Sequence, residues 1–208
     1  MVNNMVILHI SCIKNSPFSG VCVVVPEHVN SQKKYADTAL LNINNIEIDG
    51  IDKQIEYTKN FNIDNLPEPF NKPDIVVFHE AYRIEYLTIA KNLLKNNIPY
   101  IIMPHGELQK EAQKKKWFKK KVANLLLFNR FLNKAVAIQC LSVTEEKNTF
   151  LGKKKIIATN GICIPEINKT DFSNECLKIT FIGRLDPFHK GLDLLIEAIS
   201  KSKQLLLN

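Results

Sequence analysis

Short apolar runs that alternate with segments of helical spacing are the feature that most constrains the fold of this chain. The strand-like runs include "MVILHIS" (5–11), "PDIVVFHE" (73–80) and "AVAIQCLS" (135–142), and helical spacing dominates "YRIEYLTIAKNLLKNN" (82–97). Strands that are apolar almost throughout are typical of parallel sheets covered on both faces, and their alternation with helices favours the same arrangement. The pattern therefore predicts a doubly wound α/β domain, parallel and Rossmann-like, over residues 1–165.

Five further segments add to the predicted order of elements, which also includes a helix from Ser142 or Thr144 to Leu151 and a strand in "KKIIATNGI" (154–162). Residues 20–34, "GVCVVVPEHVNSQKK", fit either a strand or a helix, because their apolar spacing does not separate the two. Residues 36–43 and the first part of 98–107 are predicted strands, whereas 44–72 are rich in Asn, Asp and Pro and predict short strands and loops. A long helix is expected over 109–133. Its apolar residues recur at helical spacing, which predicts an inward-packed face: Trp117, Phe118, Val122, Leu125, Leu126 and Leu132.

The last part of the chain predicts the beginning of a second domain. Residues 166–176 are polar and are typical of a linker, and 177–208 hold one strand, "LKITFIGRL", and one amphipathic helix, "KGLDLLIEAISKS". A nucleotide-binding half-domain needs on the order of 100 residues or more. We therefore expect 177–208 to be the incomplete start of a second Rossmann-like domain, and the chain to be a fragment or truncated product of a longer protein.

Two cations flank the loop in "FIGRLDPFHKGLDLL" (181–195). Arg184 ends the predicted strand and Lys190 opens the helix that follows. Ligands of open α/β sheets bind beyond the carboxyl ends of strands, and helix N-termini attract anions. Arginine adds a fixed fork for phosphate oxygens, and lysine adds a mobile point charge. This arrangement suits a diphosphate, although on spacing alone two exposed surface charges are an equal alternative.

Charge and cysteine usage exclude several classes of protein. The formal net charge is +7, and most of the excess lies in Lys110–Lys121, which holds seven lysines and one glutamate. The five cysteines never form a CxxC pair, which argues against a disulfide framework or a zinc site and favours a reducing cytoplasm. No apolar run approaches the ~20 residues that cross a bilayer. No nucleic-acid-binding motif accompanies the lysines, so we expect no nucleic-acid partner.

Two stretches resemble one family of enzymes. "FIGRLDPFHKGLDLLIEAI" (181–199) resembles the start of the second domain of retaining family 4 glycosyltransferases of the GT-B fold, with its G-R-L and K-G motifs. Residues 105–162, from "HGELQKEAQ" to "ATNGI", resemble that family's first domain, with its H-G motif, long basic helix and N-G-I turn. The resemblance implies that 1–165 is the acceptor-side domain and that 177–208 begin the donor-binding domain.

The resemblance also implies roles for particular residues. Arg184 and Lys190 match the cations that contact the diphosphate of the sugar nucleotide. His105 matches a histidine that faces the transferred sugar and is the candidate catalytic residue, the alternative being a histidine that only caps the next helix. His79 and Glu80 end another predicted strand and are candidate contacts for acceptor or sugar, with a structural role as the alternative.

The first loop carries two more candidates. "NSPFSGV" (15–21) resembles the family's first loop, which lies close to the donor phosphates or the acceptor. Gly20 would allow the backbone to approach the diphosphate, and Ser19 is a candidate contact for acceptor or sugar. A plain turn after the first strand is the alternative.

The implied reaction transfers a sugar, with retention, from a nucleotide-sugar donor to a polysaccharide or lipid-linked glycan acceptor. The family requires no metal, so we expect no metal and no cofactor beyond the donor substrate. Family members often act at the inner face of the membrane, and Lys110–Lys121 with its aromatic residues can contact anionic lipid there. We thus expect a cytoplasmic protein, peripheral on that face, although such lysine runs are usually only solvated.

A non-catalytic alternative remains open at this point. The family's second acidic motif, two glutamates seven residues apart, has no counterpart before residue 208. The chain can therefore be an incomplete transferase that is inactive alone, or a remnant that binds acceptor glycan or an anionic membrane surface without catalysis.

Overall fold

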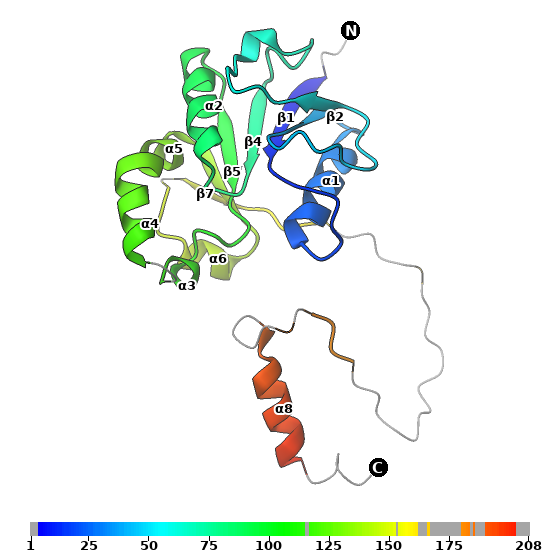
Figure 1. Ribbon diagram of the computed structural model, residues 1–208, viewed down its shortest axis with the longest axis vertical. Helices are drawn as coiled ribbons and strands as arrows, with labels where there is room; N and C mark the ends of the chain where they lie inside the picture. The colour runs from blue at the N-terminus through cyan, green and yellow to red at the C-terminus, as the bar shows by residue number, and fades with distance from the viewer. Residues whose placement is uncertain are drawn as a thin grey trace. The chain divides into compact units, whose positions relative to one another are not determined.

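The computed structural model describes residues 4–114, 117–152, 154–161, 166, 180–183, 185 and 190–202. The chain divides into two compact units, Met1–Ile162 and Cys163–Asn208. Figure 1 shows the first unit as a sheet flanked by helices. The described part of the second unit contains the helix α8 (Leu192–Lys201).

The first unit is built on a seven-stranded parallel sheet. Its strand order is β3-β2-β1-β4-β5-β6-β7, so the order reverses between β1 and β4. This confirms the predicted α/β class with a doubly wound, Rossmann-like sheet. The strands are β1 (Met5–Ser11), β2 (Ala36–Asn42), β3 (Gln54–Glu56), β4 (Ile75–His79), β5 (Tyr100–Met103), β6 (Ala137–Cys140) and β7 (Lys155–Ile157).

Helices connect most successive strands of this sheet, as is usual for parallel pairing, whereas β2 and β3 are joined by a loop. Ser142 begins one of them, because its side chain accepts a hydrogen bond from the backbone N–H of Glu145. The helical elements of the first unit are α1 (Gly20–Gln32), the short 3-10 turn η1 (Ile63–Asn65), α2 (Ile84–Lys95), α3 (Lys110–Lys114), α4 (Trp117–Ala123), the π-helical turn η2 (Asn124–Phe128), α5 (Asn129–Lys134) and α6 (Val143–Asn148).

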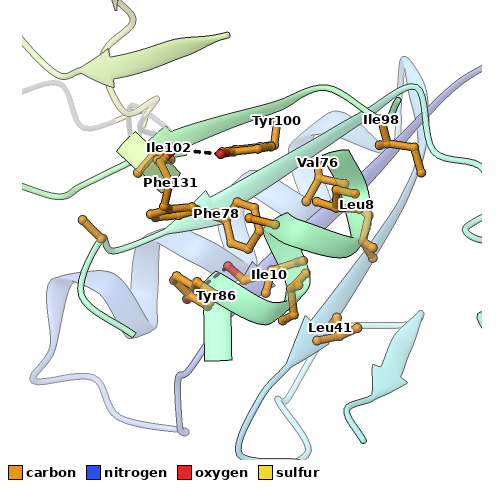
Figure 2. Packing of buried hydrophobic residues seen from close by; sticks show 14 of the residues in the cluster. Leu8, Ile10, Leu41, Val76, Phe78, Tyr86, Ile98, Tyr100, Ile102 and Phe131 are labelled. Atoms are coloured by element: carbon orange, nitrogen blue, oxygen red, sulfur yellow. Dashed lines mark hydrogen bonds between the residues drawn. The ribbon is translucent and has the colours of Figure 1, made fainter. Parts of the chain in front are cut away.

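The two faces of the sheet carry separate cores. Successive strand residues point to opposite faces, and Leu8, Ile10, Val76 and Phe78 belong to the larger core, together with Tyr86 of α2 and Phe131 of α5. Figure 2 shows these side chains meeting, with Phe78 against Tyr86. The smaller core joins Val25 and Val29 of α1 to Leu40 of β2. The residues that alternate with Leu8, Ile10 and Phe78 therefore face α1.

The ambiguous segment 20–34 forms the helix α1. Val25 and Val29 are fully buried, and the hydroxyl of Thr38 donates to the carbonyl of Val29 at 3.0 Å. The helix contains Pro26. Tertiary packing against the sheet, rather than local propensity, selects the helix here.

The prediction of one long helix over 109–133 is wrong, because the segment is not continuous and its predicted inward face is mostly exposed. The described residues form α3, α4, η2 and α5, and only Leu132 of the predicted face is buried. A π-helical turn holds about one residue more than an α-helical turn. An apolar stripe that precedes η2 therefore does not continue on the same face of the helix after η2. The following predicted side chains are exposed: Trp117, Phe118, Val122, Leu125 and Leu126.

The helix predicted in the second unit is confirmed and begins at Leu192. Gly191 precedes it with φ of 62°, in the left-handed region that glycine tolerates. The predicted linker 166–176 and the predicted strand 177–185 lie largely outside the described residues, and their boundaries stay predictions.

Candidate functional site

The reversal of strand order between β1 and β4 defines one edge of the sheet as the place where ligands bind in such folds. The loop after β1 leads to Ser19 and Gly20, at the start of α1. The strand β4 ends at His79, and His105 follows the end of β5, which pairs with β4. The topology thus brings the sequence-predicted residues of the first unit to the carboxyl edge of neighbouring strands.

A chain of hydrogen bonds joins three histidines behind this edge. Nδ1 of His9 lies 2.9 Å from Nε2 of His79, and Nδ1 of His79 lies 3.1 Å from Nε2 of His105. The planes of neighbouring rings are nearly parallel, with interplanar angles of 21° and 17°, as hydrogen bonds within the ring planes require. Nε2 of His9 lies 3.0 Å from Oε1 of Gln32, the last residue of α1. His28 meets the ring of His79 edge-on, with centroids 6.0 Å apart. We call His9, His28, His79 and His105 the histidine cluster.

The alternation of side chains along the strands explains why this cluster forms. His9 follows Leu8 and precedes Ile10, so it points to the face covered by α1 while its neighbours point to α2. His79 follows Phe78 and shares that face for the same reason. His28 and Gln32 are four residues apart on α1 and therefore lie on the same side of the helix.

Burial keeps the cluster uncharged near neutral pH. It lowers the pKa of His9 from 6.5 to about 4, against the raising effect of the bond to Gln32. It lowers the pKa of His105 to about 4 and that of His79 well below its usual value, where neighbouring histidines add to the effect. The pKa of His28, which is half-buried, is also lowered by burial. A neutral imidazole has one N–H and one lone pair, so each ring donates once and accepts once.

The backbone at the ends of β4 and β5 adopts unusual conformations. Glu80 has φ of 71° and His105 has φ of 48°, both in the left-handed region that few residues other than glycine adopt. Gly106 follows with φ of 86°. Such residues cost of order 1–3 kcal/mol each and cluster at functional sites, where the surrounding structure holds them in place.

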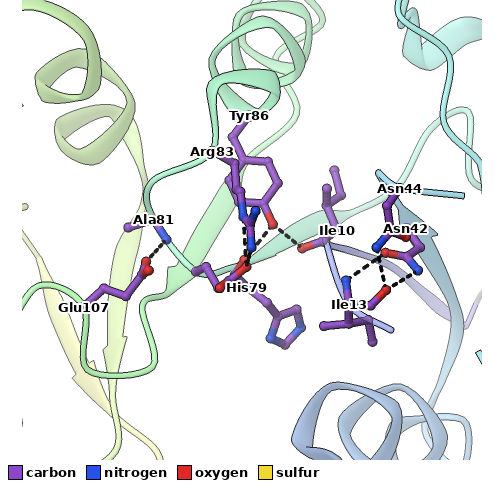
Figure 3. Close-up of polar contacts among 10 residues, drawn as sticks. Ile10, Ile13, Asn42, Asn44, His79, Ala81, Arg83, Tyr86 and Glu107 are labelled. Carbon is purple, nitrogen blue, oxygen red and sulfur yellow. Dashed lines mark hydrogen bonds and ion pairs between the residues drawn. The ribbon is translucent and has the colours of Figure 1, made fainter. Parts of the chain in front are cut away.

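Buried polar side chains hold these two loops. The hydroxyl of Tyr86 donates to the carbonyl of His79 at 2.6 Å, and the carboxylate of Glu107 accepts from the N–H of Ala81 at 2.7 Å, as Figure 3 shows. The carboxylate of Glu145, also buried, accepts from the N–H of Gly106 at 3.0 Å and from that of Leu141 at 2.6 Å. Glu145 of α6 and the bond between Glu107 and Ala81 therefore fix the turn that presents His105, while Tyr86 of α2 holds the end of β4.

Glu80 and His79 differ in what they can offer a ligand. The carboxylate of Glu80 pairs with the guanidinium of Arg83 at 2.8 Å, and the side chain of Glu80 is 19% exposed. The side chain of His79 is fully buried, and its two nitrogens face His9 and His105. Contacts of Glu80 and His79 with acceptor or sugar stay predictions. Of the three hydrogen-bonded histidines, His105 is the one that is only half-buried.

The predicted diphosphate contacts lie in both units. Gly20 is the first residue of α1, and an added Cβ there would meet nothing within 4 Å, so the space around it is open. Ser19 is the residue before the helix, and its side chain makes no capping hydrogen bond. Lys190 is exposed and precedes Gly191 at the start of α8. Arg184 lies outside the described residues.

Sequence reasoning missed His9, His28 and Gln32. The available signal was that His9 interrupts the first apolar run, as His79 ends a later one. The sequence alone did not predict the strand order that makes them neighbours. Across the described part of the chain, no three His, Cys, Asp or Glu side chains are grouped as a metal site would need.

A separate hollow lies beside the basic segment. Its volume is about 560 Å³. Apolar side chains such as Leu108, Leu125 and Phe150 line it together with the amino groups of Lys114 and Lys121. None of the helices that the structure describes is both long enough and apolar enough to cross a membrane.

Comparisons with known proteins give a likeness among solved structures. No family model matches the sequence, and no curated protein matches it. Among solved structures, the UDP-N-acetylglucosamine 2-epimerase from Rickettsia bellii resembles this chain with a TM-score of 0.38 and 13% identity. The match covers 69% of this chain and 41% of the epimerase, so the chain spans less than half the length of that protein. A likeness this weak supports no shared activity.

Proposed function

We propose that this chain provides the acceptor-side domain of a glycosyltransferase. The enzyme moves a sugar from a nucleotide diphosphate to a hydroxyl of a polysaccharide or lipid-linked glycan, with retention. The observation that carries the proposal is the position of His105, a neutral and half-buried histidine that follows β5 at the carboxyl edge of the sheet, one strand from the reversal of strand order. There the ring can hydrogen-bond a sugar hydroxyl, as the family resemblance of the H-G motif implies.

The proposed chemistry needs positive charge where the diphosphate leaves, and no metal. The family resemblance assigns this charge to Arg184 and Lys190. Within the first unit, the N-terminus of α1 at Gly20 offers free N–H groups that suit an anion. Preorganised groups of this kind stabilise the charge that develops as the glycosidic bond to phosphate breaks.

The test measures release of nucleoside diphosphate from a panel of UDP-, GDP- and ADP-linked sugars, with oligosaccharide and lipid-linked acceptors, and binding of the same donors. We expect His105→Ala to lower turnover by about 100-fold, the usual cost of removing one hydrogen-bonding group aimed at the reacting sugar. Lys91→Gln, an exposed change on α2, is the control and should leave turnover unchanged. Because the 208-residue chain is expected to be inactive alone, turnover is measured on a version extended to full GT-B length, and the proposal fails if that version neither binds nor consumes any of these donors.

The surface around α4 supports a second candidate, contact with an anionic membrane. Trp117, Phe118 and Leu126 are exposed there beside lysine side chains, and amphipathic surfaces of this kind bind anionic lipid. The amino group of Lys120 donates a hydrogen bond to the carbonyl of Ala112 within the first unit. The neighbouring lysines are therefore the ones that would contact the membrane.

Sedimentation with vesicles tests this contact. Each basic residue near an anionic surface contributes about 1 kcal/mol. The triple change Lys114→Glu, Lys119→Glu and Lys121→Glu should therefore weaken binding to phosphatidylserine vesicles by about 100-fold or more. The control reverses three exposed lysines elsewhere: Lys59, Lys91 and Lys95. Equal loss in both variants, or no binding by wild type, would exclude a specific contact through α4.

A further inference from the structure

One feature of the histidine cluster goes beyond the contact made by His105 itself. Gln32, His9, His79 and His105 form an unbroken series of side-chain hydrogen bonds with lengths of 2.9–3.1 Å. The series begins at the last residue of α1 and ends at the carboxyl edge of the sheet. Among the described residues, Nδ1 of His105 has no hydrogen-bond partner.

The direction of every proton in this series follows from its first bond, in which the amide of Gln32 is assigned with Oε1, rather than Nε2, toward His9. Oε1 of Gln32 is an acceptor, so Nε2 of His9 carries the proton and Nδ1 of His9 is left as a lone pair. Nε2 of His79 must then donate to that lone pair, which leaves Nδ1 of His79 to accept from Nε2 of His105. The same rule at the last ring leaves the lone pair of His105 on Nδ1.

We propose that Gln32, His9 and His79 are positioning residues that hold His105 in its Nε2–H tautomer and so present the lone pair of Nδ1 to a hydroxyl donor of the ligand. The identity of that donor as a sugar hydroxyl rests on the proposed function. The tautomer itself depends only on the hydrogen bonds within the first unit.

The series orients His105 and does not carry a proton away. An amide oxygen does not hold a proton at neutral pH, so a proton passed from ring to ring has no base to receive it at Gln32. The low pKa values of His9 and His105, about 4, agree with this, because a charged ring would place two donors against each other. Neutral rings therefore fix the donor-to-acceptor direction of the hydrogen bonds without taking up a charge.

The tautomers can be read directly by NMR. The chain holds five histidines, so a long-range ¹⁵N–¹H spectrum of protein labelled at histidine resolves each ring, and single substitutions assign them. Near pH 7.5 we expect His9, His79 and His105 all to carry their proton on Nε2. A proton on Nδ1 of His105 in the wild type would overturn the proposal.

Substitutions at Gln32 test the control of direction. Gln32→Glu keeps an acceptor and should leave all three tautomers unchanged. Gln32→Lys offers only donors to Nε2 of His9, so each proton in the series should move, and His105 should carry its proton on Nδ1. Ser31→Lys places the same charge on the adjacent exposed residue and is the control, in which no tautomer should change.

The outcomes separate this proposal from the proposed function. If the tautomer of His105 is unchanged in Gln32→Lys while sugar transfer or binding is present, positioning by the series is wrong and the proposed function stands. If the tautomer follows position 32 but no nucleotide sugar binds, positioning stands and the proposed function fails. Where both hold, Gln32→Lys should weaken sugar binding by about five- to tenfold, the worth of one net hydrogen bond, and Gln32→Glu should not.

Discussion

At the scale of single residues, the turn that carries His105 depends on Gly106. Its φ of 86° is strained for any residue with a Cβ, although the nearest atom to an added Cβ is 3.6 Å away. Gly106→Ala should therefore lower the free energy of unfolding by about 1–2 kcal/mol through its conformation alone. Urea unfolding followed by circular dichroism measures this difference.

Gly20 provides the matched comparison for Gly106. It begins α1, has no positive φ, and an added Cβ there meets nothing within 4 Å. Gly20→Ala should be neutral or raise the free energy of unfolding by up to about 1 kcal/mol. Equal effects of the two substitutions would show that the turn at Gly106 is not strained.

The buried histidines should make the stability of the first unit depend on pH. The pKa of His9 falls from 6.5 in the unfolded chain to about 4 in the folded one. The unfolded state thus binds more protons between these values, so stability rises with pH. The contribution of His9 is fully present above about pH 6.5 and is lost as the pH falls toward 4, and the loss amounts to about 2 kcal/mol at pH 5.

Urea unfolding at pH 7.5 and pH 5 checks this dependence. His9→Gln replaces the imidazole by an amide that does not titrate in this range. The variant should be less stable at pH 7.5, but its stability should fall less between the two pH values than that of the wild type. An identical fall in both proteins would mean that His9 is protonated in the folded state.

At the scale of elements, the pieces that replace the expected long helix differ sharply in burial. Leu126 in η2 is 72% exposed, whereas Leu132 in α5 is 1% exposed. Leu126→Ala should change the free energy of unfolding by no more than about 0.5 kcal/mol, and Leu132→Ala should lower it by about 2–5 kcal/mol. Thermal or urea unfolding of the two variants checks the difference. Comparable losses of stability in the two variants would mean that Leu126 packs inward, as the sequence predicted.

Burial explains why some elements could be predicted from the sequence and others could not. The strands β1 and β4 were predictable because both of their faces are covered, which leaves short runs of apolar residues. The helix α1 was not, because "VCVVV" at its start is β-branched and apolar on all sides, and Pro26 interrupts it. Only the contact of Val25 and Val29 with the sheet decides its form.

The candidate site was predictable in part for a related reason. His79 and His105 stand at the ends of apolar runs, so their place at the sheet edge follows from the sequence. His9 and Gln32 join them only because β1 lies beside β4 and α1 covers that face, and neither fact can be derived from local patterns. Long-range strand order is the information that a single sequence lacks here.

At the scale of the whole molecule, the two cores make the first unit a single folding body. The larger core lies on one face of the sheet and the smaller core on the other, and β2 contributes Ala39 and Leu41 to the larger core and Leu40 to the smaller one. A strand shared in this way couples the two layers, since neither face can lose its cover without exposing the same sheet. We therefore expect both layers to unfold together.

A shortened chain tests this coupling. All buried hydrophobic residues that the structure describes lie between Val6 and Cys140, within the first unit. A chain that ends at Ile162 should therefore unfold in one cooperative transition, with a midpoint close to that of the 208-residue chain. Calorimetry gives the transition, and the fluorescence of Trp117 with far-ultraviolet circular dichroism gives two further probes. Two separate transitions in the shortened chain would show that the cores on the two faces are independent, and a large fall in its midpoint would show that residues after Ile162 stabilise the sheet.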